Sequence, residues 1–192
     1  MSDRTVSMKE KIILASASPR RRELLNLITS DFEVITADVD ETTDKNETAE
    51  NTVMMLSSKK ANAVSSMHRG RVVIGADTIV VCDGKILGKP ETREHAYEML
   101  KMLSGRTHQV LTGVTITDGR KTETFFVSSD VTFFELEDEE ILSYVKSGEP
   151  DDKAGAYGIQ GKGSLLVEKI NGDYFNIVGL PVSTLSKKLK SF

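Results

Sequence analysis

The order of residue patterns along the chain predicts an α/β fold built on a mixed, strongly twisted sheet. Two observations carry this prediction. In the first half, short apolar and β-branched runs alternate with segments of helical periodicity, as in βα units. In the middle, two long runs rich in Thr and Val flank the turn sequence DGRK, which is typical of a hairpin. A length of 192 residues suits one compact domain, or two small lobes that share one sheet.

The first half of the chain is expected to contain three strands and three helices. The strands are predicted at 11–16, 32–37 and 71–81, and the helices at 19–28, 49–67 and 91–103. In the helix at 49–67, the spacing of a single apolar stripe is followed by Val53, Leu56, Ala63, Val64 and Met67. The helix at 91–103 ends just before Gly105, which favours a helix stop.

The second half is expected to be built mainly from hairpins. Strands are predicted at 107–117, 122–136, 164–170 and 174–178, a short helix at 138–146, and a closing helix through Val182, Leu185, Leu189 and Phe192. Asn171-Gly172-Asp173 separates the last two strands and resembles a tight turn. Residues 1–10 form a loose leader without an apolar core, and 11–192 are expected to form a single domain.

Composition argues against several partners. The net charge of −4 disfavours binding to a nucleic-acid polymer, although a local cationic pocket could still take a small polyanion. With Cys82 as the only cysteine and no signal peptide, we expect a reducing, cytoplasmic location. No apolar run approaches the roughly 18 residues of a spanning helix, so no membrane association is expected.

The segment ASASPRRREL places three cations where a helix should begin. Ser18 and Pro19 have the preferences of an N-cap and a first helical position. Arg20, Arg21 and Arg22 would then face the positive end of the helix dipole. This is reasonable if the helix start receives a phosphate, and the alternative is an arginine-rich solvated turn.

An acidic residue interrupts the apolar run RVVIGADTIVV. Because burying a bare carboxylate is costly, Asp77 must be paired, hydrogen-bonded or metal-bound, unless it occupies a turn between two strands. Gly75 would allow a close backbone approach or a bulge there.

A lysine lies on the apolar stripe of the helix at 49–67. Lys60 is four residues from both Leu56 and Val64, so it either snorkels to solvent or reaches an anion. Its neighbour Lys59 could take the second role instead.

The segment 151–174 is rich in glycine and polar residues but fits no phosphate-binding loop of the GxxxxGK[ST] type. It is either an ordinary glycine loop or a site in which Gln160 reads a base edge.

The remaining candidates are weaker. His68, His95 and His108 lack metal-ligand spacing and are interpreted as surface or capping residues. The Asp40-Glu41 pair could hold a hard cation or be a solvated charge cluster.

Together these motifs resemble the Maf family of nucleotide pyrophosphatases, first associated with inhibition of septum formation. The resemblance runs nearly end to end and rests on eight segments in order, namely LASASPRRREL, VDE, KKANAV, GADTIV, LGKP, MLSGRTHQVLTGV, DKAGAYGIQGKG and INGDYFNIVGLP. It implies a long curved mixed sheet with flanking helices and two lobes around a cleft, similar to inosine-triphosphate pyrophosphatase. It also implies hydrolysis of a nucleoside triphosphate to the monophosphate and pyrophosphate.

The resemblance implies a catalytic set of charged residues. Asp77 corresponds to the family's proposed proton acceptor, and Glu41, Lys60 and Lys89 match further active-site positions. Glu41 and Asp77 would hold a divalent Mg²⁺ or Mn²⁺ through oxygen. Ser57 stands where the family often has alanine before the lysine pair, which bears on the choice between Lys60 and its neighbour.

The resemblance also implies a substrate-binding set. Ser16, Arg20 and Arg21 match the phosphate-binding segment, and Thr78 and Gln160 match positions tied to substrate choice. The Arg-Thr-Gln combination of Arg20, Thr78 and Gln160 is the pattern of the subgroup that acts on dTTP and UTP. Two alternatives stay open: a house-cleaning pyrophosphatase for modified nucleotides, and a regulatory nucleotide-binding protein linked to septum formation. A homodimer is compatible with the family.

Overall fold

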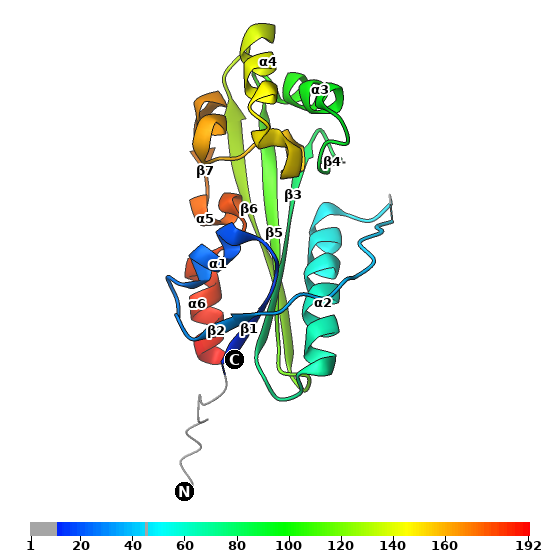
Figure 1. Cartoon of the computed structure of the whole chain (residues 1–192), viewed down its shortest axis with the longest axis vertical. Helices are drawn as coiled ribbons and strands as arrows, with labels where there is room; N and C mark the ends of the chain where they lie inside the picture. Colours follow the sequence, from blue (N-terminus) through cyan, green and yellow to red (C-terminus); the bar gives the residue numbers. More distant parts are fainter. Residues whose placement is uncertain (1–10, 45) are drawn as a thin grey trace, which may run out of the picture.

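The computed structural model describes residues 11–44 and 46–192, so the leader expected at 1–10 lies outside the described residues. The described residues form a seven-stranded mixed sheet in the order β2-β1-β3-β5-β6-β7, with β4 paired to β3. The long strands β3, β5 and β6 run through most of an elongated molecule (Figure 1). The predicted α/β class with a mixed sheet is therefore confirmed.

The bounds of the elements are as follows. The strands are β1 (Ile12–Ala15), β2 (Phe32–Val34), β3 (Val73–Cys82), β4 (Lys85–Leu87), β5 (Thr107–Thr117), β6 (Thr122–Phe133) and β7 (Val167–Asn171). The helices are α1 (Pro19–Leu25), α2 (Ala49–Met67), α3 (Arg93–Leu103), α4 (Asp138–Lys146), α5 (Tyr174–Val178) and α6 (Val182–Ser191). Three 3-10 helices lie at Glu149–Asp152, Ala154–Ala156 and Gly161–Leu166.

The sheet combines both pairing modes. Strand β1 pairs in parallel with β2 and β3, as βα units require, whereas β4, β5, β6 and β7 join by antiparallel pairing. The β5–β6 hairpin runs in continuous register from Thr107 opposite Thr132 to Thr117 opposite Thr122. The predicted long hairpin is thus confirmed, although β6 ends at Phe133 rather than at 136.

The helices divide into two lobes along the sheet. Helix α2 covers one face of the lower half and α1, α5 and α6 lie on the opposite side, while α3 and α4 gather at the other end (Figure 1). One cluster of buried residues extends through both lobes and includes Leu14, Leu100 and Leu185. Two smaller clusters, around Val64 and Val53, lie under α2.

Two glycines let α2 lie unusually close to the sheet. A Cβ on Gly75 would come within 2.4 Å of the Ser57 carbonyl oxygen, and one on Gly113 within 2.4 Å of the Val53 carbonyl oxygen. The close backbone approach expected at Gly75 is therefore confirmed, and no side chain could be added there without moving the helix. This approach brings the cavity-facing side of α2 up to Asp77 in β3.

Several sequence expectations were wrong. The hairpin expected around Asn171-Gly172-Asp173 does not form, because Asp173 Oδ1 accepts from Phe175 N and caps helix α5 at 174–178. The strand expected at 164–170 begins at Val167, after a 3-10 helix. The helix expected at 19–28 ends at Leu25.

One strand was missed. Asp83 and Gly84 both have positive φ, 49° and 74°, and turn β3 back into the short strand β4. The Asp-Gly pair between two apolar runs is a hairpin signal that could have revealed it.

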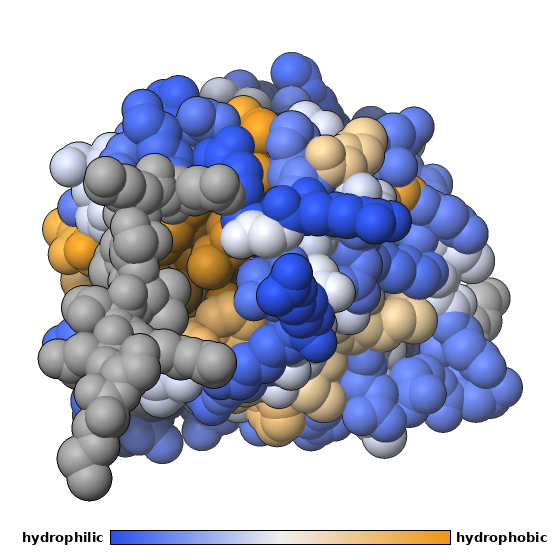
Figure 2. All heavy atoms as spheres, turned by 90° about the horizontal axis from the view of Figure 1, so that it is seen from below, coloured by the Kyte–Doolittle hydropathy of each residue, from blue (hydrophilic) through white to orange (hydrophobic). Residues whose placement is uncertain are grey.

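The lower end of the molecule presents mostly hydrophilic side chains with small apolar areas between them (Figure 2). Among the described helices, none is both long and apolar enough to cross a membrane.

Candidate active site

A cavity of about 970 Å³ opens between the two lobes, in the size range of ligand pockets. All nine site residues expected from the sequence line it, namely Ser16, Arg20, Arg21, Glu41, Lys60, Asp77, Thr78, Lys89 and Gln160. They come from the loop after β1, α1, the loop after β2, α2, β3, the loop after β4 and the loop before β7. Residues separated by as many as 144 positions in the sequence therefore share one cavity.

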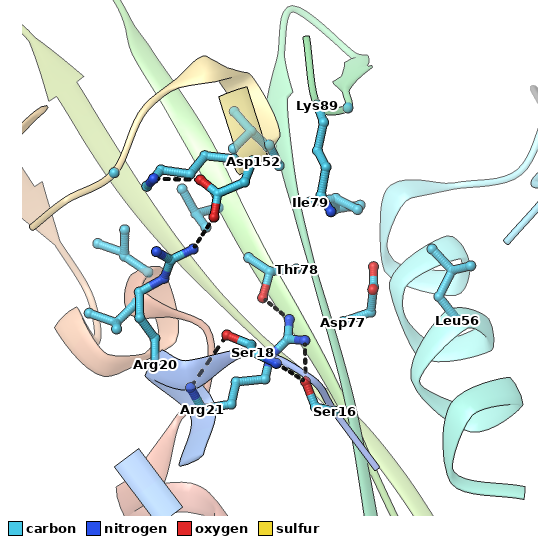
Figure 3. A pocket seen from close by; sticks show the side chains of 18 of the residues that line it. Ser16, Ser18, Arg20, Arg21, Leu56, Asp77, Thr78, Ile79, Lys89 and Asp152 are labelled. Carbon is cyan, nitrogen blue, oxygen red and sulfur yellow. Dashed lines mark hydrogen bonds and ion pairs between the residues drawn. The ribbon is translucent and has the colours of Figure 1, made fainter. Parts of the chain in front are cut away.

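The start of α1 contributes the cationic side of the cavity. Ser18 is the N-cap and its hydroxyl accepts from the backbone N of Arg21 at 3.5 Å, while Pro19 begins the helix, as expected. Arg20 reaches across the cleft, with its Nη2 3.9 Å from Asp152 Oδ2 (Figure 3). Arg22 is exposed and does not line the main cavity, so two of the three arginines face it.

Arg21 is held from three directions. Its Nε donates to the Gly179 carbonyl at 2.8 Å. Its Nη1 donates to Ser16 Oγ at 3.1 Å and its Nη2 to Thr78 Oγ1 at 2.9 Å (Figure 3). Burial lowers the pKa of Arg21, an effect that Asp77 opposes and Arg20 reinforces. Because a guanidinium has five N–H donors, two remain for a ligand after these three contacts.

The acidic side of the cavity is organised by one lysine. Lys60 Nζ lies 2.5 Å from Asp77 Oδ1 and 2.9 Å from Glu41 Oε1. Of the two roles open to it, Lys60 therefore reaches an anion rather than snorkelling. Lys59 instead donates to the carbonyls of Asp40 and Thr42, and so fastens the loop that carries Glu41.

The two carboxylates suit a hard divalent cation. Glu41 and Asp77 both contact the Lys60 ammonium, so the two carboxylates lie close together, and a cation that they shared would lie beside this ammonium. Mg²⁺ is commonly bound by one or two carboxylates together with substrate phosphates. Among the residues that the structure describes, no group of three or more His, Cys, Asp or Glu side chains could hold a metal ion, so the substrate phosphates would have to complete the coordination by Glu41 and Asp77.

Comparison with known proteins decides the family. The family model described as "Maf-like protein" matches residues 11–192. The chain belongs to the Maf family. A relative from Bacillus cereus (strain G9842), named "dTTP/UTP pyrophosphatase", is 51% identical over 183 residues, which cover 95% of this chain and 96% of the relative. A relative of the same name from Bacillus mycoides (strain KBAB4) is 53% identical over 182 residues, 95% of each chain.

Solved structures agree with this Maf-family fold at greater distance. The Staphylococcus aureus Ham1 protein aligns with a TM-score of 0.57 at 16% identity, covering 95% of this chain and 99% of that protein. A HAM1 protein from Coxiella burnetii aligns with a TM-score of 0.52 at 13% identity, covering 95% and 100%. At these identities the likeness concerns the fold alone.

The Maf-family cavity contains charged residues that sequence reasoning missed. Glu149, Asp152 and Lys153 line the side opposite α1. Lys153 Nζ donates to Asp152 Oδ1 at 2.6 Å and to the Glu149 carbonyl at 2.5 Å, and the lysine lowers the pKa of Asp152. The run DDK beside the glycine-rich segment was a signal that could have indicated Asp152 and Lys153.

His108 is the one histidine whose interpretation was wrong. It is only 2% exposed, and its Nε2 lies 2.7 Å from the hydroxyl of Tyr157, which lines the cavity. His68, by contrast, is the C-cap of α2, as a capping residue should be. The alternation of the strand was a signal that could have indicated this, because His108 shares its face of β5 with Val110, Val114 and Ile116, which are all buried.

Proposed function

We propose that this chain hydrolyses dTTP and UTP to the nucleoside monophosphate and pyrophosphate. The observation that carries the proposal is the shared cavity, in which the arginines of α1 face the Asp77–Lys60–Glu41 group. A triphosphate is an elongated polyanion, and a site for cutting it needs cations for the phosphates and a base for water. The names of the Bacillus relatives support the same substrates.

Asp77 would serve as the general base. Lys60 holds its Oδ1, and Oδ2 receives no hydrogen bond from residues 11–44 and 46–192, so this oxygen is available to a water molecule. As that water attacks the α-phosphorus, its proton passes to Asp77. The bond from the α-phosphorus to the bridging oxygen breaks, and the electron pair leaves with pyrophosphate.

Four cations would bind the phosphates. Arg20 and Arg21 approach from α1 and Lys60 from α2. Lys89 approaches from the loop after β4, on the upper side of the cavity (Figure 3). Ser16 would add a hydroxyl beside Arg21. Their charge would neutralise the leaving pyrophosphate as it develops.

A divalent cation such as Mg²⁺ or Mn²⁺, held by Glu41 and Asp77 when bound, would polarise the phosphates and lower the pKa of the attacking water. Gln160, exposed at the cavity edge, would read the pyrimidine base, since its amide both donates and accepts.

The test is pyrophosphate release by the purified chain over a panel of common and modified nucleoside triphosphates. Asp77→Asn should lower kcat by about 10²–10⁴-fold, the usual contribution of a general base, with an unchanged circular dichroism spectrum. The control Asp31→Asn removes an exposed carboxylate outside the cavity and should keep the kcat of the wild-type protein. EDTA should stop turnover, and added Mg²⁺ should restore it.

Other outcomes would overturn the proposal. Near-normal turnover in Asp77→Asn would remove this carboxylate from the chemistry. A stronger preference for modified nucleotides would favour a house-cleaning enzyme, and tight nucleotide binding without pyrophosphate release would favour a regulatory binding protein.

A further inference from the structure

A directed chain of hydrogen bonds runs from the cavity into the sheet. Arg21 Nη2 donates to Thr78 Oγ1 at 2.9 Å, and Thr78 Oγ1 lies 2.9 Å from Thr112 Oγ1 in the neighbouring strand. Thr112 Oγ1 in turn lies 2.8 Å from the carbonyl oxygen of Asn176 in α5. The chain thus joins α1, β3, β5 and α5.

The direction of every bond in this chain follows from the chemistry of its last member. A carbonyl oxygen only accepts, so the single hydroxyl proton of Thr112 goes to Asn176. Thr112 must then accept from Thr78, and the hydroxyl proton of Thr78 is committed to Thr112. Thr78 consequently presents lone pairs alone to Arg21 and to the cavity.

The far end of this hydrogen-bond chain is buried and held by further hydrogen bonds. Asn176 and Thr112 are both 0% exposed, and the Asn176 side chain donates to the Val110 carbonyl and to Ser129 Oγ, each at 2.9 Å. The same helix ends at Gly179, whose carbonyl accepts from Arg21 Nε at 2.8 Å. Helix α5 therefore holds the guanidinium twice, directly through Gly179 and indirectly through Thr112.

We propose that Thr112 is a positioning residue for substrate binding: by taking the proton of Thr78, it makes Thr78 an obligate acceptor that fixes the Arg21 guanidinium toward the cavity. This rests on the proposed function, in which Arg21 binds phosphate. It also changes the role of Thr78, which cannot donate to a base carbonyl and influences the substrate through Arg21. Without the Thr112 hydroxyl, the proton of Thr78 has no acceptor in β5, so the Thr78 hydroxyl can rotate and no longer fixes the Arg21 guanidinium in one orientation.

The test compares Thr112→Val, Thr112→Ser and the matched control Thr115→Val. Thr115 is also in β5 and 0% exposed, but its hydroxyl contacts Ser57 and Thr124. Thr112→Val should raise KM for dTTP and UTP and lower kcat/KM by about tenfold, the equivalent of one hydrogen bond to a charged group. Thr112→Ser and Thr115→Val should stay within about twofold of the unchanged chain.

A second readout does not depend on turnover. The ¹⁵N-labelled chain should give a protected Arg21 Nε–H resonance, identified by its loss in Arg21→Lys. Thr112→Val should shift this resonance and speed its exchange with solvent, whereas Thr115→Val should leave it in place. If Thr112→Val does not fold, Thr78→Val should produce the same spectral change.

An unchanged Arg21 resonance in a folded Thr112→Val or Thr78→Val variant would overturn the positioning role, as would equal losses of kcat/KM in Thr112→Val and Thr115→Val. If the wild-type protein released no pyrophosphate, the proposed activity would be wrong. The spectra would still show whether Thr112 positions Arg21 through the hydrogen-bond chain.

Discussion

The buried side chain of His108 shows how the properties of a single polar residue depend on the groups around it. His108 is enclosed by Phe133 and Tyr157, whose rings lie edge-on to it at centroid distances of 5.0 and 5.3 Å. Its Nε2 contacts Tyr157, whereas its Nδ1 has no hydrogen-bond partner among the described residues. Burial lowers the pKa of His108 from 6.5 to about 4, so the imidazole is neutral at physiological pH.

This neutrality predicts a pH-dependent stability. Between pH 6.5 and about 4 the unfolded chain binds a proton at His108 that the folded chain does not, so the free energy of unfolding falls as the pH drops through this window. The full loss is roughly 3 kcal/mol at 1.36 kcal/mol for each pKa unit. Urea unfolding of His108→Gln at pH 7, 6 and 5 should show a clearly reduced slope. His95→Gln should keep the original slope, and an unchanged slope in His108→Gln would contradict this explanation.

At the scale of elements, the contact between α2 and the sheet places the catalytic candidates. Ser57 and Val53 present backbone carbonyls to Gly75 and Gly113, so α2 lies against β3 and β5 with no side chain between them. Lys60 follows one turn after Ser57 on the same helix, and it meets Asp77 two residues after Gly75. A displacement of α2 would therefore separate Lys60 from both carboxylates.

Gly75→Ala tests this contact. Its new Cβ would meet the Ser57 carbonyl and Ala61 backbone N at 2.4 and 2.7 Å, so the helix must shift. We expect a loss of about 1–3 kcal/mol in the free energy of unfolding, as in other overpacked sites, together with reduced turnover. The matched control is Gly88→Ala, whose Cβ would meet nothing within 4 Å and whose stability should be nearly unchanged. Equal stability of the two variants in urea unfolding would refute the close approach.

At the scale of the molecule, the cavity lies between lobes that share one long sheet. Arg20 from the lower lobe and Asp152 from the upper lobe meet across it, but at 3.9 Å and with Asp152 two-thirds exposed the pair adds little stability. A triphosphate that contacts Arg20 and Lys89 together would link the lobes far more strongly. Arg20 would then exchange its contact with Asp152 for the bound phosphates.

Binding of a non-hydrolysable substrate should consequently stabilise the whole molecule. A UTP analogue with a methylene between the α- and β-phosphates, added with Mg²⁺ at 100 times its Kd, should add about 2.7 kcal/mol to the free energy of unfolding. UMP at the same concentration should raise Tm much less, because it lacks the β- and γ-phosphates. Arg20→Ala should weaken the response to the analogue. Equal Tm shifts with UMP and the analogue would contradict a triphosphate site.

Much of the fold follows from patterns that are local in the sequence. Helix α2 begins and ends at the residues its periodicity predicts, although Met67, expected on the apolar stripe, is 63% exposed. The β5–β6 hairpin also follows from local patterning, because the DGRK turn fixes which residues face each other. The segment 174–178 could not be predicted in this way, since four of its five residues are β-formers that favour a strand, and the cap by Asp173 makes it a helix.

By itself, the sequence determined the mixed α/β architecture and the helix start at Ser18, and its resemblance to a known family implied nine residues that all line one cavity. These depend on periodicity, capping and motif, which are properties of neighbouring residues. Only the tertiary structure decided that Lys60 joins Asp77 to Glu41, that His108 is buried, and that Thr112 takes the proton of Thr78. Such contacts depend on how closely a helix approaches the sheet and on which hydrogen-bond donor meets which acceptor. Both are determined only when side chains that are far apart in the sequence pack against each other.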